Sequence, residues 1–290
     1  MYNVTNMLEA VDNQNNPEKL FLGEHPVSVD SFVSSAPGKG QDGIFIGKGF
    51  VAVADGQTPL APGHEKEVIK YVKELLGALD KAKGKSTQDM FRSAIGSAKK
   101  DGVEAWAVPS STVVDVRVVG EEIVIELLGD CFAVVKQGEQ YTVIKDTGLH
   151  SQEDNEAIQK LGILMSEGKS FKEASEEIGP MLRKSRAKIN TPDGYWVAAN
   201  NEEASEHVEV HKFSVDSVDD ILIGSDGISR LVEIFGLLTY SELLELCSEK
   251  GVKPVIEGLR ELEETDPNCE KYPRFSKNDD ATAAMIHFNK

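Results

Sequence analysis

Four apolar stretches of the sequence each carry a carboxylate at one end. They are residues 50–54 before Asp55, 123–128 before Gly129-Asp130, 221–224 before Ser225-Asp226, and 281–288 after Asp279-Asp280. If folding brings these ends together, the carboxylates repel one another and must take up protons or be neutralised. Mg²⁺ and Mn²⁺ suit carboxylate and water ligands. Two such ions about 3.5–4 Å apart would clamp a phosphoryl group and supply hydroxide near neutral pH.

The competing explanation is a simple turn, because Asp-Gly is a favoured hairpin dipeptide. The sequence contains five of them, beginning at Asp42, Asp55, Asp101, Asp193 and Asp226. Any one alone is better explained as a turn. Asp55 and Asp226 stand out because each ends an apolar run, and a buried strand fixes its end residue better than a flexible loop does.

The elements that must position these residues are predicted from periodicity. Short apolar runs predict strands at residues 27–33, 44–46, 50–54, 112–119, 122–128, 131–136, 141–145, 195–199, 208–213, 221–224 and 281–288. Apolar residues at the helical period predict helices at 68–79, 86–100, 152–166, 170–188, 228–234, 240–250 and 255–264. We expect Gly179-Pro180 to kink or divide the helix that contains it.

The order of these elements indicates the fold class. The connections between residues 112 and 145 are short, which favours antiparallel neighbours, since parallel pairing needs a long crossover. Runs of strands alternate with pairs of helices, so we predict an α+β fold of antiparallel sheets covered by helices, not a doubly wound parallel sheet. We expect residues 1–20 to be an irregular lead-in and residues 21–290 to be a single domain.

Composition limits the classes of binding partner and the cellular compartment that we expect for this chain. The 290 residues include 31 Lys and Arg against 49 Asp and Glu, a net charge of −18, which disfavours a nucleic-acid partner. No stretch approaches the roughly 18–20 apolar residues of a membrane span, and the polar start lacks a signal-peptide core. The 3 cysteines are scattered and odd in number, which argues against a disulfide framework. We expect a cytoplasmic monomer that binds neither nucleic acid nor membrane.

The order of the motifs resembles that of the metal-dependent serine/threonine protein phosphatases of type 2C, especially their compact bacterial members. The motifs that carry the resemblance are Gln41-Asp42-Gly43, the run 51–56, Ser111-Thr112, Gly129-Asp130-Cys131, Ser225-Asp226-Gly227 and Asp279-Asp280-Ala281-Thr282. Cys131 replaces the Ser of the family, and Asp280 replaces its Asn. Each motif is short, but six in the same order over about residues 27–288 make the resemblance fairly specific.

The resemblance implies a fold and a set of metal ligands. The fold is a β-sandwich of two antiparallel sheets flanked by helix pairs, with the metals in a cleft at one end. Asp55 would bridge two ions of Mg²⁺ or Mn²⁺, and the carbonyl of Gly56 would hold one of them. Asp226 and Asp279 would hold the other.

The same resemblance implies supporting roles for other residues. Asp42 would orient a metal-bound water, and Asp130 would support a third, weaker ion. Many relatives have an Arg that contacts the substrate phosphate, and here its position is Pro37. Lys39 is the nearest cation and is predicted to take over, although it lacks the two-pronged fit of Arg. Thr58-Pro59 replaces the usual Gly-Gly, so the loop over the metals should have a different shape.

The function implied is hydrolysis of phosphoserine and phosphothreonine monoesters in a phosphorylated protein. A metal-bridging hydroxide attacks phosphorus and the serine or threonine oxygen leaves, without a covalent phosphoenzyme. Two alternatives stay open: a non-catalytic relative that binds a partner, and a phosphatase for a small phosphorylated metabolite. Pro37 and the altered loop after Gly56 favour the non-catalytic alternative, whereas the retained acidic set favours the enzyme.

Other patterns are better explained by structure. His207 and His211 would share one strand face, but two half-exposed strand residues explain the pair more simply. The sequence contains no Gly-x-Ser-x-Gly elbow and no Gly-x₄-Gly-Lys-Ser/Thr loop. The lysine-rich stretch 81–85 is typical of a solvated helix end.

Overall fold

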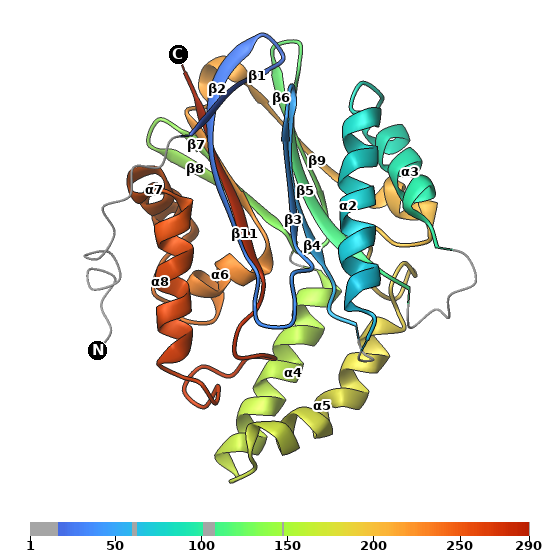
Figure 1. Ribbon diagram of the computed structural model, residues 1–290, viewed down its shortest axis with the longest axis vertical. Coiled ribbons are helices and arrows are strands. Elements are labelled where there is room, and N and C mark those ends of the chain that lie inside the picture. Colours follow the sequence, from blue (N-terminus) through green and yellow to red (C-terminus); the bar gives the residue numbers. More distant parts are fainter. Residues whose placement is uncertain (1–16, 60–62, 101–107, 147, 290) are drawn as a thin grey trace.

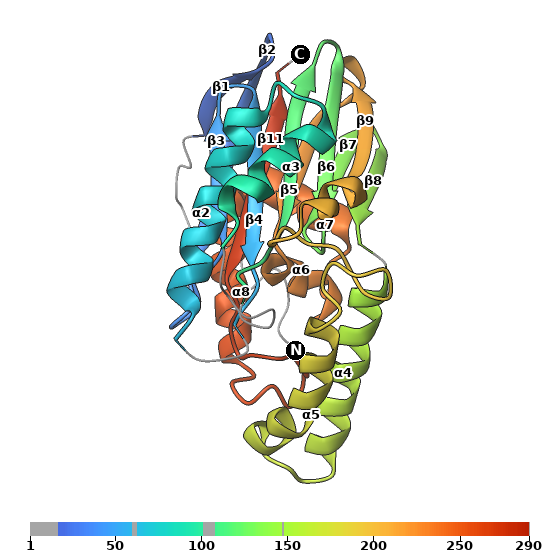
Figure 2. The same ribbon diagram turned by 90° about the vertical axis from the view of Figure 1, so that its right-hand side faces the viewer.

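Two antiparallel sheets pack face to face, and helices cover both outer sides (Figures 1 and 2). The computed structural model in Figure 1 describes residues 17–59, 63–100, 108–146 and 148–289. The predicted α+β sandwich is therefore confirmed. No helix of these segments is long and apolar enough to cross a membrane.

The first sheet has six strands in the order β1-β2-β11-β10-β7-β8. They are β1 (Glu18–Leu22), β2 (His25–Ser34), β11 (Ala281–Phe288), β10 (Asp220–Gly224), β7 (Phe132–Gln137) and β8 (Gln140–Lys145). All neighbours are antiparallel. Because Ala281 pairs with Ser34, and Gly224 pairs with Ala283, the start of β11 lies beside the ends of β2 and β10.

The second sheet has five strands in the order β3-β4-β5-β6-β9. They are β3 (Gly43–Gly47), β4 (Phe50–Gly56), β5 (Ser111–Val119), β6 (Glu122–Leu128) and β9 (Glu209–Ser214). Alternate residues of both sheets, among them Val51, Val53, Ile125 and Ile223, are fully buried in the core between them. Burial of these apolar side chains is the main force that holds the sheets together.

The helices form three groups. α2 (Glu65–Ala82) and α3 (Thr87–Ala98) cover the five-stranded sheet, and α6 (Asp226–Glu233), α7 (Tyr240–Lys250) and α8 (Val252–Glu264) cover the other. α4 (Leu149–Ser166) and α5 (Phe171–Arg186) form a helical hairpin that projects from one end (Figure 2). Two short 3₁₀ turns, η2 (Glu202–His207) and η3 (Val215–Ser217), flank β9.

Residues 195–199 differ from the prediction, because they form no strand. They make two isolated bridges, from Ser111 to Ala198 and from Ile189 to Tyr195. Their alternating pattern arises because Tyr195, Val197 and Ala199 pack in one small apolar cluster. The alternation of apolar and polar residues in this segment therefore indicated a buried face, although the segment forms no strand ladder.

Two further expectations were wrong in part. The lead-in does not extend to residue 20, because Glu18–Leu22 form the edge strand β1, and Leu22 is fully buried in the core. The rest of the lead-in, residues 1–16, lies outside the described residues. Pro180 does not divide its helix, since α5 runs through it. A capping box between Ser170 and Glu173 fixes the start of α5, and buried Ile178 anchors it.

Candidate metal centre

The strand ends that carry the predicted carboxylates meet at one end of the sandwich. β4 ends at Asp55-Gly56, and Asp226 follows β10 as the first residue of α6. Asp55 pairs with Thr112 at the start of β5, which also adjoins the end of β6. Gly129 lies so close to Thr112 that a Cβ there would be 2.4 Å from Cγ2, and its φ is +91°. Only glycine fits that turn, which leads directly into Asp130.

Two other glycines permit close approach of the backbone. A Cβ on Gly56 would lie 2.6 Å from the carbonyl oxygen of Gln41, and one on Gly227 would lie 1.8 Å from that of Asp280. The glycines of both selected Asp-Gly motifs therefore serve more than a turn. They allow the segments that carry Asp42 and Asp280 to pack against the ends of β4 and β10.

Asp55 and Asp226 are buried next to each other, and their carboxyl groups share a hydrogen bond. Burial raises the pKa of Asp55 well above its ordinary value, and the charges of Asp42, Asp226 and Asp130 raise it further. Burial, followed by the charges of Asp279 and Asp130, raises the pKa of Asp226 to about 7. Without added positive charge, this pair holds a proton at neutral pH.

Asp42 belongs to the same group. Burial, followed by the charge of Asp280, raises the pKa of Asp42 to about 8, while the hydroxyls of Ser225 and Thr282 lower it in part. Its Oδ2 and the Thr282 Oγ1 are nevertheless buried without a hydrogen bond of good geometry. A buried oxygen without a partner costs free energy that a proton or a bound cation would recover.

Asp279 is in the opposite situation, because cations of the chain bind both of its oxygens. Lys39 Nζ donates to Oδ1 at 2.5 Å, and Arg230 Nη2 donates to Oδ2 at 2.6 Å. Burial opposes ionisation, but Arg230 and then Lys39 outweigh it and hold the pKa of Asp279 below its usual range. Arg230 also donates to the fully buried Glu263 at 3.0 Å, so it is fixed in place.

Asp280 organises the segment that precedes β3. Its carboxylate accepts backbone hydrogen bonds from Ala36 at 2.7 Å, Gly40 at 2.8 Å and Gln41 at 2.5 Å. This explains the Asp at the position where the phosphatases have Asn: a carboxylate accepts all of these bonds, whereas an amide has one accepting oxygen. The resemblance to the family identified Asp280 as a departure from the usual Asn but assigned it no role.

A cleft of about 320 Å³ adjoins the cluster. Asp130, Asp226 and Asp279 line it, whereas Asp42 and Asp55 do not. Its cationic lining residues, which the sequence did not single out, are Lys145, Arg230 and Arg274. The sequence could have indicated Arg230, because it lies four residues after Asp226 and therefore on the same side of α6. A larger hollow of about 740 Å³ lies between α2 and α3 and shares no lining residue with the cleft.

The oxygen donors of this site fit a hard divalent cation. The set consists of carboxylates, burial and neighbouring carboxylates raise the pKa values of Asp42, Asp55 and Asp226, and Asp42 has an unpartnered oxygen. As they lie, no three His, Cys, Asp or Glu side chains of the described segments form a group that could hold a metal ion. If Asp55, Asp226 and Asp279 are the ligands, as the resemblance implies, an ion would enter only after the Asp55–Asp226 hydrogen bond opens and Asp279 turns from its two cations.

The other predicted residues have simpler surroundings. Lys39 is bound to Asp279 and to Ser276 at 3.3 Å, so its contact with substrate phosphate stays a prediction, as do the roles of Gly56 and Asp130. His207 lies in η2 and stacks on Trp196 with ring centroids 3.6 Å apart. It therefore shares no strand face with His211, and the expectation of two half-exposed strand residues was wrong for His207.

By sequence, no family model and no curated protein matches this chain. By structure, the serine/threonine phosphatase PstP/Ppp of Mycobacterium tuberculosis aligns with 91% of this chain and 99% of its own, with a TM-score of 0.52 and 14% identity. The phosphatase Stp1 of Staphylococcus aureus aligns with 97% of this chain and 100% of its own, with a TM-score of 0.51 and 14% identity. This chain has the type 2C (PPM) phosphatase fold.

A third structure agrees: the PPM Ser-Thr phosphatase MsPP of Mycobacterium smegmatis aligns with 90% of this chain and 98% of its own, with a TM-score of 0.51 and 14% identity. One PstP structure contains two manganese ions. The PPM fold implied by the six motifs is thereby confirmed across nearly the whole chain. Identity this low establishes the fold alone, so the activity must be argued from the residues.

Proposed function

We propose that this PPM-fold protein is a metal-dependent phosphatase that hydrolyses phosphoserine and phosphothreonine monoesters in proteins. The observation that carries this proposal is the group of Asp42, Asp55 and Asp226, which are buried together with raised pKa values at the end of the strands. A fold that needed these groups only for stability would pair them with cations, as it does for Glu126 and Glu263.

We infer that Mg²⁺ or Mn²⁺ supplies the missing charge. Asp55, Asp226, Asp279 and the carbonyl of Gly56 would hold two ions, and Asp130 would support a third. When bound, the ions would lower the pKa of a coordinated water and neutralise charge on the phosphoryl oxygens. The two manganese ions in PstP support this assignment.

The residues of the chain would bind and orient the substrate. Arg230 lines the cleft and would supply positive charge to a phosphate group, while it also pairs with Glu263 and Asp279. The buried Asp42 would accept a hydrogen bond from the attacking water and orient it toward phosphorus. Lys39 would contact the phosphate once Asp279 turns toward a metal ion and releases its amine. We further infer a cytoplasmic monomer that acts in phosphorylation signalling, with neither nucleic acid nor a membrane as a partner.

Hydrolysis of p-nitrophenyl phosphate tests the reaction class directly. We expect turnover that MnCl₂ stimulates and that EDTA abolishes. The exposed Asp193, which begins another Asp-Gly dipeptide, provides a control because Asp193→Asn should leave turnover unchanged. Absence of metal-stimulated turnover in the folded protein would contradict the proposal. A faster reaction with a small phosphorylated metabolite than with phosphopeptides would reassign the substrate.

One observation favours a second candidate, the non-catalytic relative. Lys39 and Arg230 already occupy both oxygens of Asp279, one of the four proposed ligands. A non-catalytic protein would bind fewer manganese ions than two, and isothermal titration calorimetry would count them. Two bound ions together with turnover would exclude it.

A further inference from the structure

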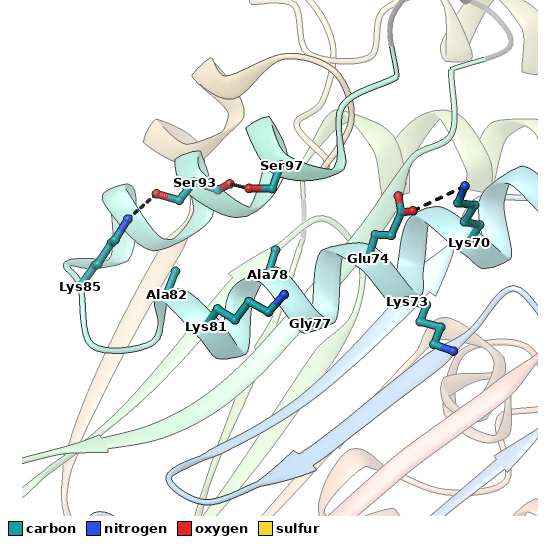
Figure 3. A pocket seen from close by; sticks show the side chains of 10 residues that line it. All are labelled: Lys70, Lys73, Glu74, Gly77, Ala78, Lys81, Ala82, Lys85, Ser93 and Ser97. Carbon is teal, nitrogen blue, oxygen red and sulfur yellow. Dashed lines mark hydrogen bonds and ion pairs between the residues drawn. The ribbon is translucent and has the colours of Figure 1, made fainter.

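A groove of about 740 Å³ between α2 and α3 carries positive charge in a chain of net charge −18 (Figure 3). Four lysines line it: Lys70, Lys73, Lys81 and Lys85. The only carboxylate among its lining residues is Glu74. On a surface where acidic residues outnumber basic ones, this local excess of cations calls for an anionic ligand.

Most of this charge is not neutralised within the chain. Lys73 and Lys81 are exposed and make no ion pair with any residue in the described ranges. Lys70 Nζ lies 3.8 Å from Glu74, whose other oxygen binds Lys100. Lys85 donates to the Ser93 hydroxyl at 2.8 Å and so extends from the end of α2 to α3 (Figure 3). The groove therefore presents two amines, those of Lys73 and Lys81, that no carboxylate of the described residues pairs with.

The floor of the groove consists of small residues. Gly77 and Ala78 of α2 face Ser93 and Ser97 of α3 across it. Glycine inside a helix costs about 1 kcal/mol relative to alanine. A Cβ on Gly77 would meet nothing within 4 Å, so packing does not require the glycine. Its absent side chain instead leaves room for the backbone of a ligand between the lysines.

The end of the groove is held firmly by a buried side chain. Arg117 donates to the carbonyl oxygens of Lys83 at 3.0 Å and Lys85 at 3.2 Å, and Glu126 binds the same guanidinium. The loop between α2 and α3 is thereby anchored to the sheet. A ligand would bind a largely preformed surface, which reduces the entropy lost on association.

We propose that this groove binds a short acidic segment of a partner polypeptide in an extended conformation. Lys70 and Lys81 lie on one face of α2, and eleven residues of helix place them about 17 Å apart. That distance matches about five extended residues of a peptide. A longer polyanion, such as a nucleic acid or an anionic membrane, would extend beyond the groove, where the net charge of −18 opposes its binding. Binding here does not depend on catalysis in the cleft.

Fluorescence anisotropy with the full chain tests this binding. The probe is a labelled peptide of alternating glutamate and alanine, and EDTA is present so that metal in the cleft cannot hold it. We expect saturable binding that weakens as salt is raised, because the lysines are exposed. The double variant K73E/K81E should bind at least about tenfold more weakly. Lack of binding by the unmodified chain would overturn the proposal.

Two variants test whether peptide binding depends on the groove itself and not on net charge or on a loss of folding. K48E/K250E changes the charge equally at exposed lysines outside the groove, and we expect it to bind the peptide normally. Equal loss in both double variants would reduce the effect to net charge and overturn the proposal. Gly77→Leu should fill the floor and weaken peptide binding without lowering the melting temperature. Unchanged binding by that variant would place the peptide elsewhere.

Two further measurements examine other occupants. Tighter binding of a single-stranded oligonucleotide of equal charge, or of vesicles with anionic lipid, would overturn the choice of a peptide. Light scattering of the chain should give the same mass for the unmodified protein and for K73E/K81E. A dimer that this variant dissociates would instead assign the groove to a second copy of the chain.

Discussion

Two groups of buried carboxylates differ in the source of their positive charge. Beneath the loop between α2 and α3, Arg117 holds Glu126 with two hydrogen bonds of 2.8 and 2.7 Å. Its neighbour Asp115 has its pKa raised by burial and then by Glu126, so one guanidinium and one proton balance the two acids. At the end of the strands, Asp55 and Asp226 share a hydrogen bond without such a guanidinium fork. The first group contains a cation of the chain, whereas no guanidinium binds the second; each group keeps buried oxygens without a hydrogen-bond partner, on Asp115 in the first and on Asp42 in the second.

The largest effect expected from this difference is on activity. Asp55→Asn or Asp226→Asn should lower Mn²⁺-dependent hydrolysis of p-nitrophenyl phosphate by about a thousandfold or more, because each removes a charged metal ligand. Circular dichroism should show an unchanged fold. Activity within about tenfold of the unmodified chain would remove Asp55 or Asp226 from the proposed ligand set.

Removal of the resident cation from the other group should instead affect stability. Arg117→Met leaves Glu126 buried without a cationic partner, bound only to Thr87 and Asp115, and should lower the free energy of unfolding by about 3–5 kcal/mol, measured by urea denaturation. Arg92, which pairs with Glu206 at 3.1 Å on the surface, provides the matched control. Arg92→Met should cost less than about 1 kcal/mol. Similar losses in both variants would show that burial of the Arg117 pair is unimportant.

The pH dependence of stability should report the raised pKa values of both groups, and only the share of the second group should respond to Mn²⁺. Without metal, the pKa values of Asp42 and Asp226 lie at about 8 and about 7, above the ordinary 3.8, so the folded chain binds more protons than the unfolded chain between these limits. Stability should therefore fall as pH rises from about 4 to about 8. Asp279 has a lowered pKa, so its contribution to stability is complete above about pH 4 and does not change within this window.

Urea unfolding in EDTA at about pH 5.5 and about pH 8 measures this fall, which we expect to reach at least about 2 kcal/mol. MnCl₂ should reduce it by replacing the protons. Asp226→Asn should also reduce it and, near neutral pH, should stabilise the metal-free chain by roughly 1 kcal/mol. A metal-free Asp226→Asn variant that melts at a lower temperature would contradict the account of repulsion.

The smallest effect concerns Lys39. Its loss leaves Asp279 still bound to Arg230, so Lys39→Ala should hardly alter stability. We expect KM for a phosphopeptide to rise about threefold to tenfold with kcat nearly unchanged, and Lys39→Arg to restore KM in part. An unchanged KM in Lys39→Ala would exclude contact between this amine and the phosphate.

The sequence was most informative where backbone pattern decides the outcome. The pattern predicted strands with Asp55 and Asp226 at their ends, whereas the convergence of those ends was an assumption that the family resemblance supported. The register of antiparallel strands fixes where those ends lie. Side-chain partners across the fold were not predictable in this way. The pairing of Asp279 with Lys39 and Arg230 depends on three segments far apart in the chain and on the rotamer that each side chain adopts.

The groove between α2 and α3 could not be predicted from the sequence either. The stretch 81–85 was interpreted as a solvated helix end, which is correct for its exposure. The sequence did not show that α3 runs beside it, or that Gly77 leaves an open floor. Likewise β1 was missed because a five-residue edge strand with exposed Glu18 and Lys19 carries little periodicity.

The bond from the Ala36 amide to Asp280 joins residues 244 positions apart, and β2 pairs with β11 along its length. Loops of that span close slowly, so this pairing should be among the late and rate-limiting steps of folding. The proposed metal ligands would then come together only after β2 and β11 have paired. In a refolding experiment, manganese affinity should therefore appear only when the entire domain has folded.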